Sequence, residues 1–141
     1  MIYIIYLETV RYVTDKKFNT LTVHLISGLI QLLCPFCEFE IDDNNYIGIT
    51  RCPECSRAFS VYYAIGKQQL NNDNFEEAIE NFFKAIKYFK NTALLHLDLA
   101  RAYNHVGNEE GYTYALNRAE EIDEELYHEY IEKHKLKKLV A

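Results

Sequence analysis

The sequence predicts a mainly α-helical protein with a small β-structured segment ahead of the helices. Three observations lead to this fold class. Two Cys-x2-Cys pairs begin at residues 34 and 52, apolar residues follow a helical period from residue 62 onward, and the helical half repeats after 34 residues. A chain of 141 residues with 49% hydrophobic and 26% charged residues is globular in composition. That length suits one ordinary domain or two small ones.

Residues 1–33 form an apolar N-terminal segment. The run 1–7 is rich in Ile and Tyr and favours a strand, whereas the spacing over 20–32 predicts a helix. Both runs are shorter than the roughly 18–20 residues that span a bilayer, and no basic leader precedes the first run, as one would in a signal peptide. We expect a strand or hairpin and then a helix, packed on the rest of the protein. The alternatives are a membrane-surface anchor and an extension without a selected fold.

The chain contains four cysteines, Cys34, Cys37, Cys52 and Cys55. Each pair places two thiolates on one turn, and the fourteen residues between the pairs suit a hairpin that brings the turns together. Four soft sulfur ligands complete a tetrahedral zinc shell and leave no open position for a substrate. The pattern predicts one structural zinc ion in a ribbon over residues 34–61, and hence a reducing, cytoplasmic environment. Two disulfides in an oxidising compartment are the alternative.

Between residue 62 and the C-terminus the apolar residues recur at helical spacing. Asn74 and Asn108 suit helix N-caps, and Gly107 suits a left-handed C-cap. The final helix begins at Asp123, is acidic in its first turn and ends in lysines, as the helix dipole favours. These signals predict a helix from about residue 62, helices within 75–89, 93–106 and 109–121, and a capping helix and tail over 123–141.

An internal repeat relates the two halves of the region 62–122. Residues of similar size recur 34 positions apart, and the small ones stand where two antiparallel helices must approach closely. The matching pairs are Ile65 and Leu99, Gly66 and Ala100, Asn74 and Asn108, Phe82 and Leu116, and Ala85 and Ala119. A helix–turn–helix period of this length is the signature of tetratricopeptide repeats (TPR).

Two resemblances follow from these residues. The stretch Tyr62-x2-Ile65-Gly66 with Phe75-x2-Ala78 and Phe82-x2-Ala85 resembles the TPR consensus, and the second repeat departs from it with Tyr112 at a position where Ala is usual. The cysteine segment resembles the short finger-like zinc ribbon found near the start of many prokaryotic proteins. Glu38 and Ser56 replace the glycine that is usual after each cysteine pair, so those turns should be tight or strained. The resemblances imply two TPR-like α-hairpins and a C-terminal capping helix behind a zinc ribbon.

The TPR resemblance implies a concave groove, lined by the first helix of each repeat, that binds a protein or peptide partner. Lys67 and Arg101 stand at equivalent positions, so the groove should carry a small positive patch that favours an acidic or C-terminal carboxylate ligand. The alternative is that both side chains are simply solvated. The expected groove residues are Tyr63, Lys67, Leu70 and Asn71 in the first repeat, and Leu97, Arg101, Asn104 and His105 in the second.

Charge and motif content narrow the function further. The net charge is -6, and the ribbon segment 34–61 has two basic and five acidic residues, which argues against a nucleic-acid partner. The sequence shows no nucleophile arrangement and no glycine-rich phosphate loop. We therefore expect a non-enzymatic interaction adaptor. A nucleic-acid-associated ribbon regulator and a membrane-surface adaptor anchored by residues 1–33 are the alternatives.

Two repeats alone bury little hydrophobic core, and about three repeats are usually needed for stability. The ribbon or the N-terminal segment should therefore cover the open end at residues 60–70. Self-association of the chain through apolar residues of 1–33 is the other solution.

Overall fold

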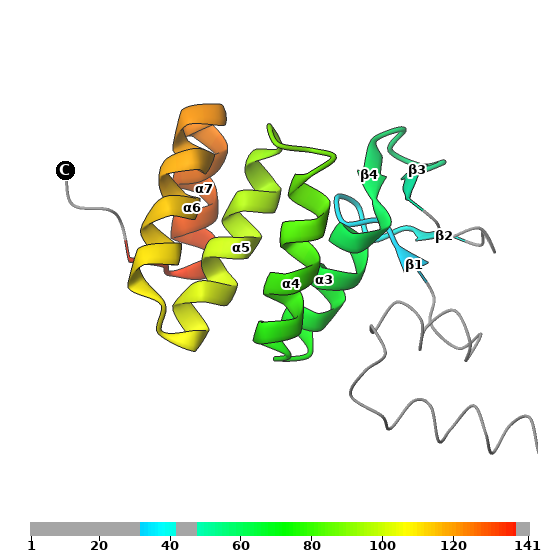
Figure 1. The fold of residues 1–141 in the computed structure, drawn as a ribbon. Coiled ribbons are helices and arrows are strands. Elements are labelled where there is room, and N and C mark those ends of the chain that lie inside the picture. The colour runs from blue at the N-terminus through cyan, green and yellow to red at the C-terminus, as the bar shows by residue number, and fades with distance from the viewer. Residues whose placement is uncertain (1–31, 42–47, 138–141) are drawn as a thin grey trace, which may run out of the picture.

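The computed structural model describes residues 32–41 and 48–137 (Figure 1). Over these residues the protein is mainly helical, with two small antiparallel sheets followed by five α-helices. Figure 1 shows α3, α4, α5 and α6 side by side in chain order, with α7 behind α6 and both sheets at the end next to α3. The strand predicted over 1–7 and nearly all of the helix predicted over 20–32 lie outside the described residues.

The ribbon is made of two short β-hairpins. Strand β1 (Leu32–Leu33) pairs with β2 (Glu40–Ile41), and β3 (Ile49–Arg51) pairs with β4 (Ala58–Ser60). Each hairpin carries one cysteine pair in its turn, which we call knuckle one (residues 34–39) and knuckle two (residues 52–57). Residue 32, predicted as the end of a helix, is in strand β1 because it pairs with residue 41.

The five helices agree closely with the windows expected from the sequence. They are α3 (Val61–Asn71), α4 (Phe75–Ile86), α5 (Ala93–Val106), α6 (Glu109–Ile122) and α7 (Glu124–His134). The Asn108 side chain accepts a hydrogen bond from the Gly111 N–H at 2.9 Å, and Gly107 ends α5 at φ 74°. Both predicted caps around residue 108 are therefore confirmed.

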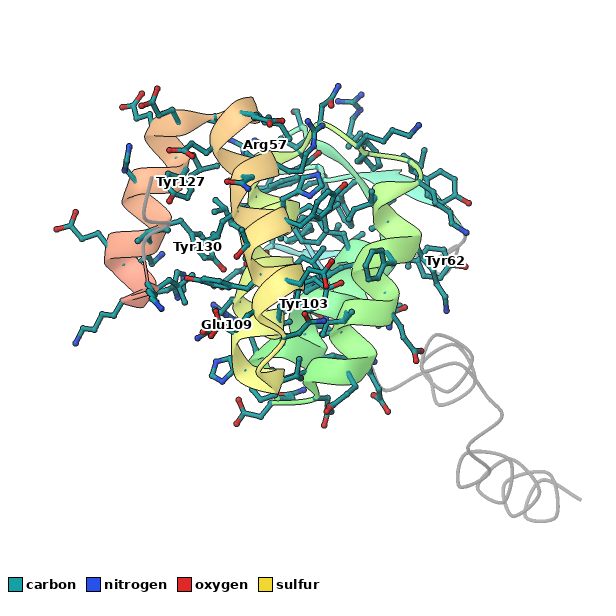
Figure 2. The ribbon with its side chains drawn as sticks, turned by 60° about the vertical axis from the view of Figure 1, so that its left-hand side comes forward. Arg57, Tyr62, Tyr103, Glu109, Tyr127 and Tyr130 are labelled. Atoms are coloured by element: carbon teal, nitrogen blue, oxygen red, sulfur yellow. The ribbon has the colours of Figure 1, made fainter. Side chains whose placement is uncertain are left out.

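Asp123 is the single residue between α6 and α7. Its side chain accepts a hydrogen bond from the Leu126 N–H at 2.9 Å, as an N-cap carboxylate does. The helix ends earlier than the predicted segment 123–141, because Lys135 adopts a left-handed conformation with φ 52°. Figure 2 shows Tyr127 and Tyr130 extending from α7 toward the neighbouring helices.

The ribbon packs on α3 and shares a hydrophobic cluster with it. Val61, Ala64 and Ile65 of α3 are buried together with ribbon residues that include Phe59. Phe36 of knuckle one also contacts the main helical core. The ribbon therefore covers the open end at residues 60–70, as the small core of the helical half requires.

Gly66 lies where α3 packs closely against α4. A Cβ atom built on Gly66 would lie 2.8 Å from the ring of Phe82 and 3.2 Å from the carbonyl oxygen of Ala78. The ring cannot move away, because Phe82 is fully buried. The small residue predicted at this position is therefore required by packing.

Replacing Gly66 by Ala should destabilise the protein by about 1–2 kcal/mol. Overpacking of a core costs about 1–3 kcal/mol, and the higher helix propensity of Ala returns up to about 1 kcal/mol. Chemical denaturation followed by circular dichroism measures the difference. An unchanged or higher stability of the Ala variant would mean that α3 and α4 do not approach as closely as described.

Candidate metal centre and the adjoining pocket

The four cysteine side chains meet between the two knuckles. All four Sγ atoms lie within 4.8 Å of one another. Cys34 Sγ is 3.7 Å from Cys55 Sγ, and Cys37 Sγ is 3.6 Å from Cys52 Sγ. In a tetrahedron with metal–sulfur bonds of about 2.3 Å, the sulfurs are about 3.8 Å apart. The four cysteines are thus positioned to coordinate one metal ion.

The two knuckles have the same backbone geometry, which explains why the sulfurs converge. In each knuckle the first cysteine makes two backbone hydrogen bonds. Its carbonyl oxygen accepts from the N–H of the residue four positions later, and its own N–H donates to the carbonyl oxygen of the residue five positions later. The bonds are Glu38 N to Cys34 O at 2.9 Å, Ser56 N to Cys52 O at 2.9 Å, Cys34 N to Phe39 O at 2.9 Å, and Cys52 N to Arg57 O at 3.0 Å.

Each knuckle contains one residue in the left-handed region, where glycine is favoured. Glu38 has φ 62° and Ser56 has φ 61°. These are the two positions at which the sequence predicts tight or strained turns. The strain expected there from the sequence is therefore present in the backbone of both turns.

Replacing Ser56 by Gly should stabilise the metal-bound protein by about 1 kcal/mol. A left-handed conformation costs a residue with a Cβ roughly 1–2 kcal/mol, part of which is offset by the greater freedom of glycine in the unfolded chain. Thermal unfolding measures the gain, and Glu38→Gly provides an independent repeat in the other knuckle. A lower melting temperature in both variants would show that these turns do not carry the strain.

The thiols of the site differ in how easily they ionise. Burial raises the pKa of Cys34 to about 12, although the N–H groups of Phe36 and Cys37 favour its thiolate. Burial also opposes ionisation of Cys52, but the N–H donors of Cys55 and Glu54 and the neighbouring thiols outweigh it and lower its pKa to about 7. A metal ion held by these cysteines would supply the positive charge that keeps all four sulfurs ionised together.

A pocket of about 480 Å³ lies beside knuckle one. Residues of the knuckle form one side, and side chains of α3, α5 and α7 form the others. Lys67 and Asn71 come from α3, Arg101 comes from α5, and Lys133 comes from α7. Helix α7, predicted only as a capping helix, therefore contributes directly to this surface.

The residues predicted to line a groove are distributed between two pockets and the core. Lys67, Asn71 and Arg101 line the first pocket. Tyr63, Leu70 and Leu97 are buried in the helical core at 2%, 2% and 0% exposure. A second pocket of about 410 Å³ shares Asn71, Arg101 and His134 with the first. The predicted residues that line the second pocket are Leu70, Asn71, Arg101, Asn104 and His105.

The two cations at equivalent repeat positions have different surroundings. Lys67 Nζ donates to the carbonyl oxygen of Pro35 at 2.6 Å and lies 3.6 Å from the Asp98 carboxylate. Arg101 donates to Asn71 Oδ1 at 3.0 Å and contacts His134 Nδ1 at 3.3 Å. The Lys67 ammonium is thus paired inside the protein, and Arg101 is held by neutral groups at the junction of the pockets.

His134 is suited to its contact with the arginine. Burial lowers the pKa of His134, and the charge of Arg101 lowers it further. The neutral imidazole that results can accept a hydrogen bond from the guanidinium at Nδ1.

Asp98 joins the three helices that surround the pocket. Its carboxylate is 1% exposed and accepts hydrogen bonds from the hydroxyl groups of Tyr63 at 2.7 Å and Tyr130 at 2.5 Å. Burial and the adjacent Asp98 charge raise the pKa of both tyrosines. Sequence reasoning missed this cluster. The signal for it was an acidic residue at position 98 between Leu97 and Leu99 in an apolar window.

Two further findings concern membrane-spanning helices in the described residues and the similarity of the chain to known proteins. Among helices within 32–41 and 48–137, none combines the length and the apolar character needed to cross a membrane. The chain matches no protein-family model, no curated protein and no solved structure.

Proposed function

We propose that this protein is a non-enzymatic interaction adaptor, built from a structural zinc ribbon and two TPR-like α-hairpins with a capping helix. Three features support the repeat assignment. First, helices α4 and α6 begin 34 residues apart. Second, Gly66 of the first repeat packs against Phe82. Third, the residues at the equivalent positions of the second repeat, Ala100 and Leu116, are both fully buried.

Zinc fits the cysteine site better than disulfides do. The short Sγ distances of 3.6 and 3.7 Å join cysteines of different knuckles, and both are far longer than a disulfide bond of about 2.05 Å. Four thiolates in a tetrahedron favour zinc among the common divalent ions. Bound zinc would crosslink the two hairpins, and a reduced thiolate site suits the cytoplasm.

One observation carries the adaptor proposal: Lys67, Asn71 and Arg101 come from two different helices and line the same pocket. The second pocket continues from Asn71 and Arg101 along the end of α7. Two adjoining pockets of this kind suit a segment of a partner protein, and the side chains that hold Arg101 between them, Asn71 and His134, are neutral.

The arginines of the ribbon do not favour the nucleic-acid alternative. Arg51 donates to the carbonyl oxygen of Ser56. The Arg57 guanidinium lies 5.0 Å from the ring centroid of Phe36. Both cations therefore serve contacts within the ribbon. The membrane-anchor alternative depends on residues 1–33, nearly all of which lie outside the described part of the chain.

Partner capture by purified full-length protein tests the proposal. We expect the wild type to enrich a specific partner from a lysate of the source organism, and Arg101→Glu to lose it. Arg118→Glu is the matched control, because Arg118 is a half-exposed arginine on α6 that pairs with Glu121 at 2.6 Å. Quantitative mass spectrometry reads out the capture. Equal capture by the Arg101 variant would refute the groove.

A further inference from the structure

We infer that the recognition site is a composite pocket, in which knuckle one of the ribbon and helices α3, α5 and α7 together bind an acidic peptide segment that also carries an apolar side chain. This inference rests on the proposed adaptor function and adds two things to it. It makes the metal-held knuckle part of the binding surface, and it specifies the chemistry of the partner segment.

Knuckle one is fixed against the helices by several contacts. Lys67 Nζ of α3 donates to the Pro35 carbonyl oxygen at 2.6 Å. The Phe36 ring packs edge-on against Tyr63 of α3 at 5.8 Å and against Phe59 at 6.4 Å. Because Pro35 and Phe36 also line the pocket, knuckle one forms a fixed wall of the pocket.

The two ends of the pocket differ in polarity. Leu94 and Leu126 are partly buried and stand in the first turns of α5 and α7. Arg101 and Lys133 follow them on the same helices, seven residues later in both cases. Seven residues are two helical turns, or about 10 Å. The pocket thus runs from an apolar end to a cationic end.

The distribution of charge in the pocket selects the orientation of an acidic ligand. Glu38 of knuckle one and Glu129, one turn before Lys133 on α7, also line it. Asp98 is compensated by Lys67 and by two tyrosine hydroxyls. Cys37 lines the pocket as well, so the zinc-bound thiolates add negative charge on the side of knuckle one. A ligand carboxylate is therefore repelled by the knuckle and by Glu129, and it is attracted to Arg101 and Lys133. Its apolar side chain then lies toward Leu94 and Leu126.

The distance between the two ends sets the spacing within the ligand. About 10 Å corresponds to three residues of extended peptide at roughly 3.3 Å each. The matching segment has one apolar residue followed three and four positions later by acidic residues. The second acidic residue ensures that one carboxylate points toward Arg101, because side chains of an extended chain alternate in direction.

Fluorescence anisotropy with defined peptides tests the inference on the full-length, zinc-loaded protein. The probe is a fluorescein-labelled Ser/Gly peptide that contains Leu-Ser-Ser-Glu-Glu. Two counterparts replace Leu by Ser or both Glu by Lys. We expect the first probe to bind more tightly than either counterpart, at least about tenfold more tightly than the Lys version.

Two pairs of variants separate the helical groove from the knuckle wall. Arg101→Gln should weaken binding of the acidic probe by about tenfold or more, the usual loss for a charge-assisted hydrogen bond, with Arg118→Gln as its control. Glu38→Lys should tighten binding about threefold or more, because it removes a like charge and adds an opposite one. Glu54→Lys makes the same charge change on knuckle two, outside the pocket. It should change the binding free energy of the probe less than half as much as Glu38→Lys does.

The outcomes distinguish the two proposals. Sensitivity to Arg101→Gln without any difference between Glu38→Lys and Glu54→Lys would keep the helical groove and overturn the composite pocket. Insensitivity to Arg101→Gln, or preference for the Lys peptide, would overturn both the composite pocket and the proposed groove. Circular dichroism and one zinc ion per chain must be unchanged in every variant compared.

Discussion

Replacing Cys52 by Ser should abolish stoichiometric metal binding and unfold the ribbon. The two hairpins have strands of two and three residues, which are too short to fold without a crosslink. The free energy of binding a structural zinc ion is about 10–16 kcal/mol in small zinc domains, and it is at the same time folding free energy. Removing one of four thiolates therefore removes the main stabilising interaction of this segment.

The damage should extend to α3. Val61, Ala64 and Ile65 are buried against the ribbon at 1–3% exposure, so an unfolded ribbon exposes them to water. A loss of even about 2 kcal/mol lowers the melting temperature of a domain this size by roughly 8–16 °C. Hydrogen exchange should accelerate more in α3 than in α6, because α6 contributes no residue to the hydrophobic cluster that α3 shares with the ribbon.

Three measurements check this result. Elemental analysis should find about one zinc ion per wild-type chain and almost none in Cys52→Ser. Glu54→Ser is the control, because it changes an exposed residue between the two cysteines of the same knuckle. A wild-type protein that remains fully folded without metal and contains two disulfides would contradict the zinc site altogether.

The features that could be predicted from the sequence are those set by local spacing. A Cys-x2-Cys turn brings its two sulfurs to one side whatever surrounds it, and the second pair follows in the next hairpin. Helix starts at residues 75 and 109 were predictable because the apolar period and the preceding Asn are contiguous in the chain. Such signals need no knowledge of distant contacts.

The features that could not be predicted depend on which surfaces meet in space. Nothing local to residues 124–134 indicates that Tyr130 and Lys133 face the same pocket as Lys67. The buried position of Leu97 likewise follows from how α5 packs between α4, α6 and α7, which the spacing of the repeat alone does not indicate. Groove residues transferred by spacing alone therefore included three core residues, Tyr63, Leu70 and Leu97, and omitted α7.

Asp98 is the residue in which these unpredicted contacts converge. It stands in α5 and accepts one hydroxyl hydrogen bond from α3 and one from α7. Lys67 supplies the compensating charge at 3.6 Å with a side chain that is itself 21% exposed. Because the carboxylate is almost completely buried, its interactions hold α3 and α7 at the positions that define the pocket.

Asp98→Ala should therefore destabilise the protein by about 3–5 kcal/mol, the range for removing one partner of a buried ion pair. The substitution leaves the hydroxyls of Tyr63 and Tyr130 without their acceptor in the core. Asp98→Asn keeps the size and one oxygen acceptor, so we expect a smaller loss of about 1–3 kcal/mol. Chemical denaturation gives both values, and Glu129→Ala, an exposed acidic residue on α7, should remain within about 0.5 kcal/mol of the wild type.

A multiple-substitution test separates the hydrogen bonds from the packing of Asp98. Tyr63→Phe and Tyr130→Phe each remove one donor and leave a carboxylate oxygen less well satisfied. If the hydroxyls matter through Asp98, the two Phe substitutions should cost less in the Asp98→Ala background than in the wild type, with a coupling energy of about 0.5–3 kcal/mol. Strict additivity would mean that the tyrosines stabilise α3 and α7 independently of Asp98, and the carboxylate would then not be what holds the pocket together.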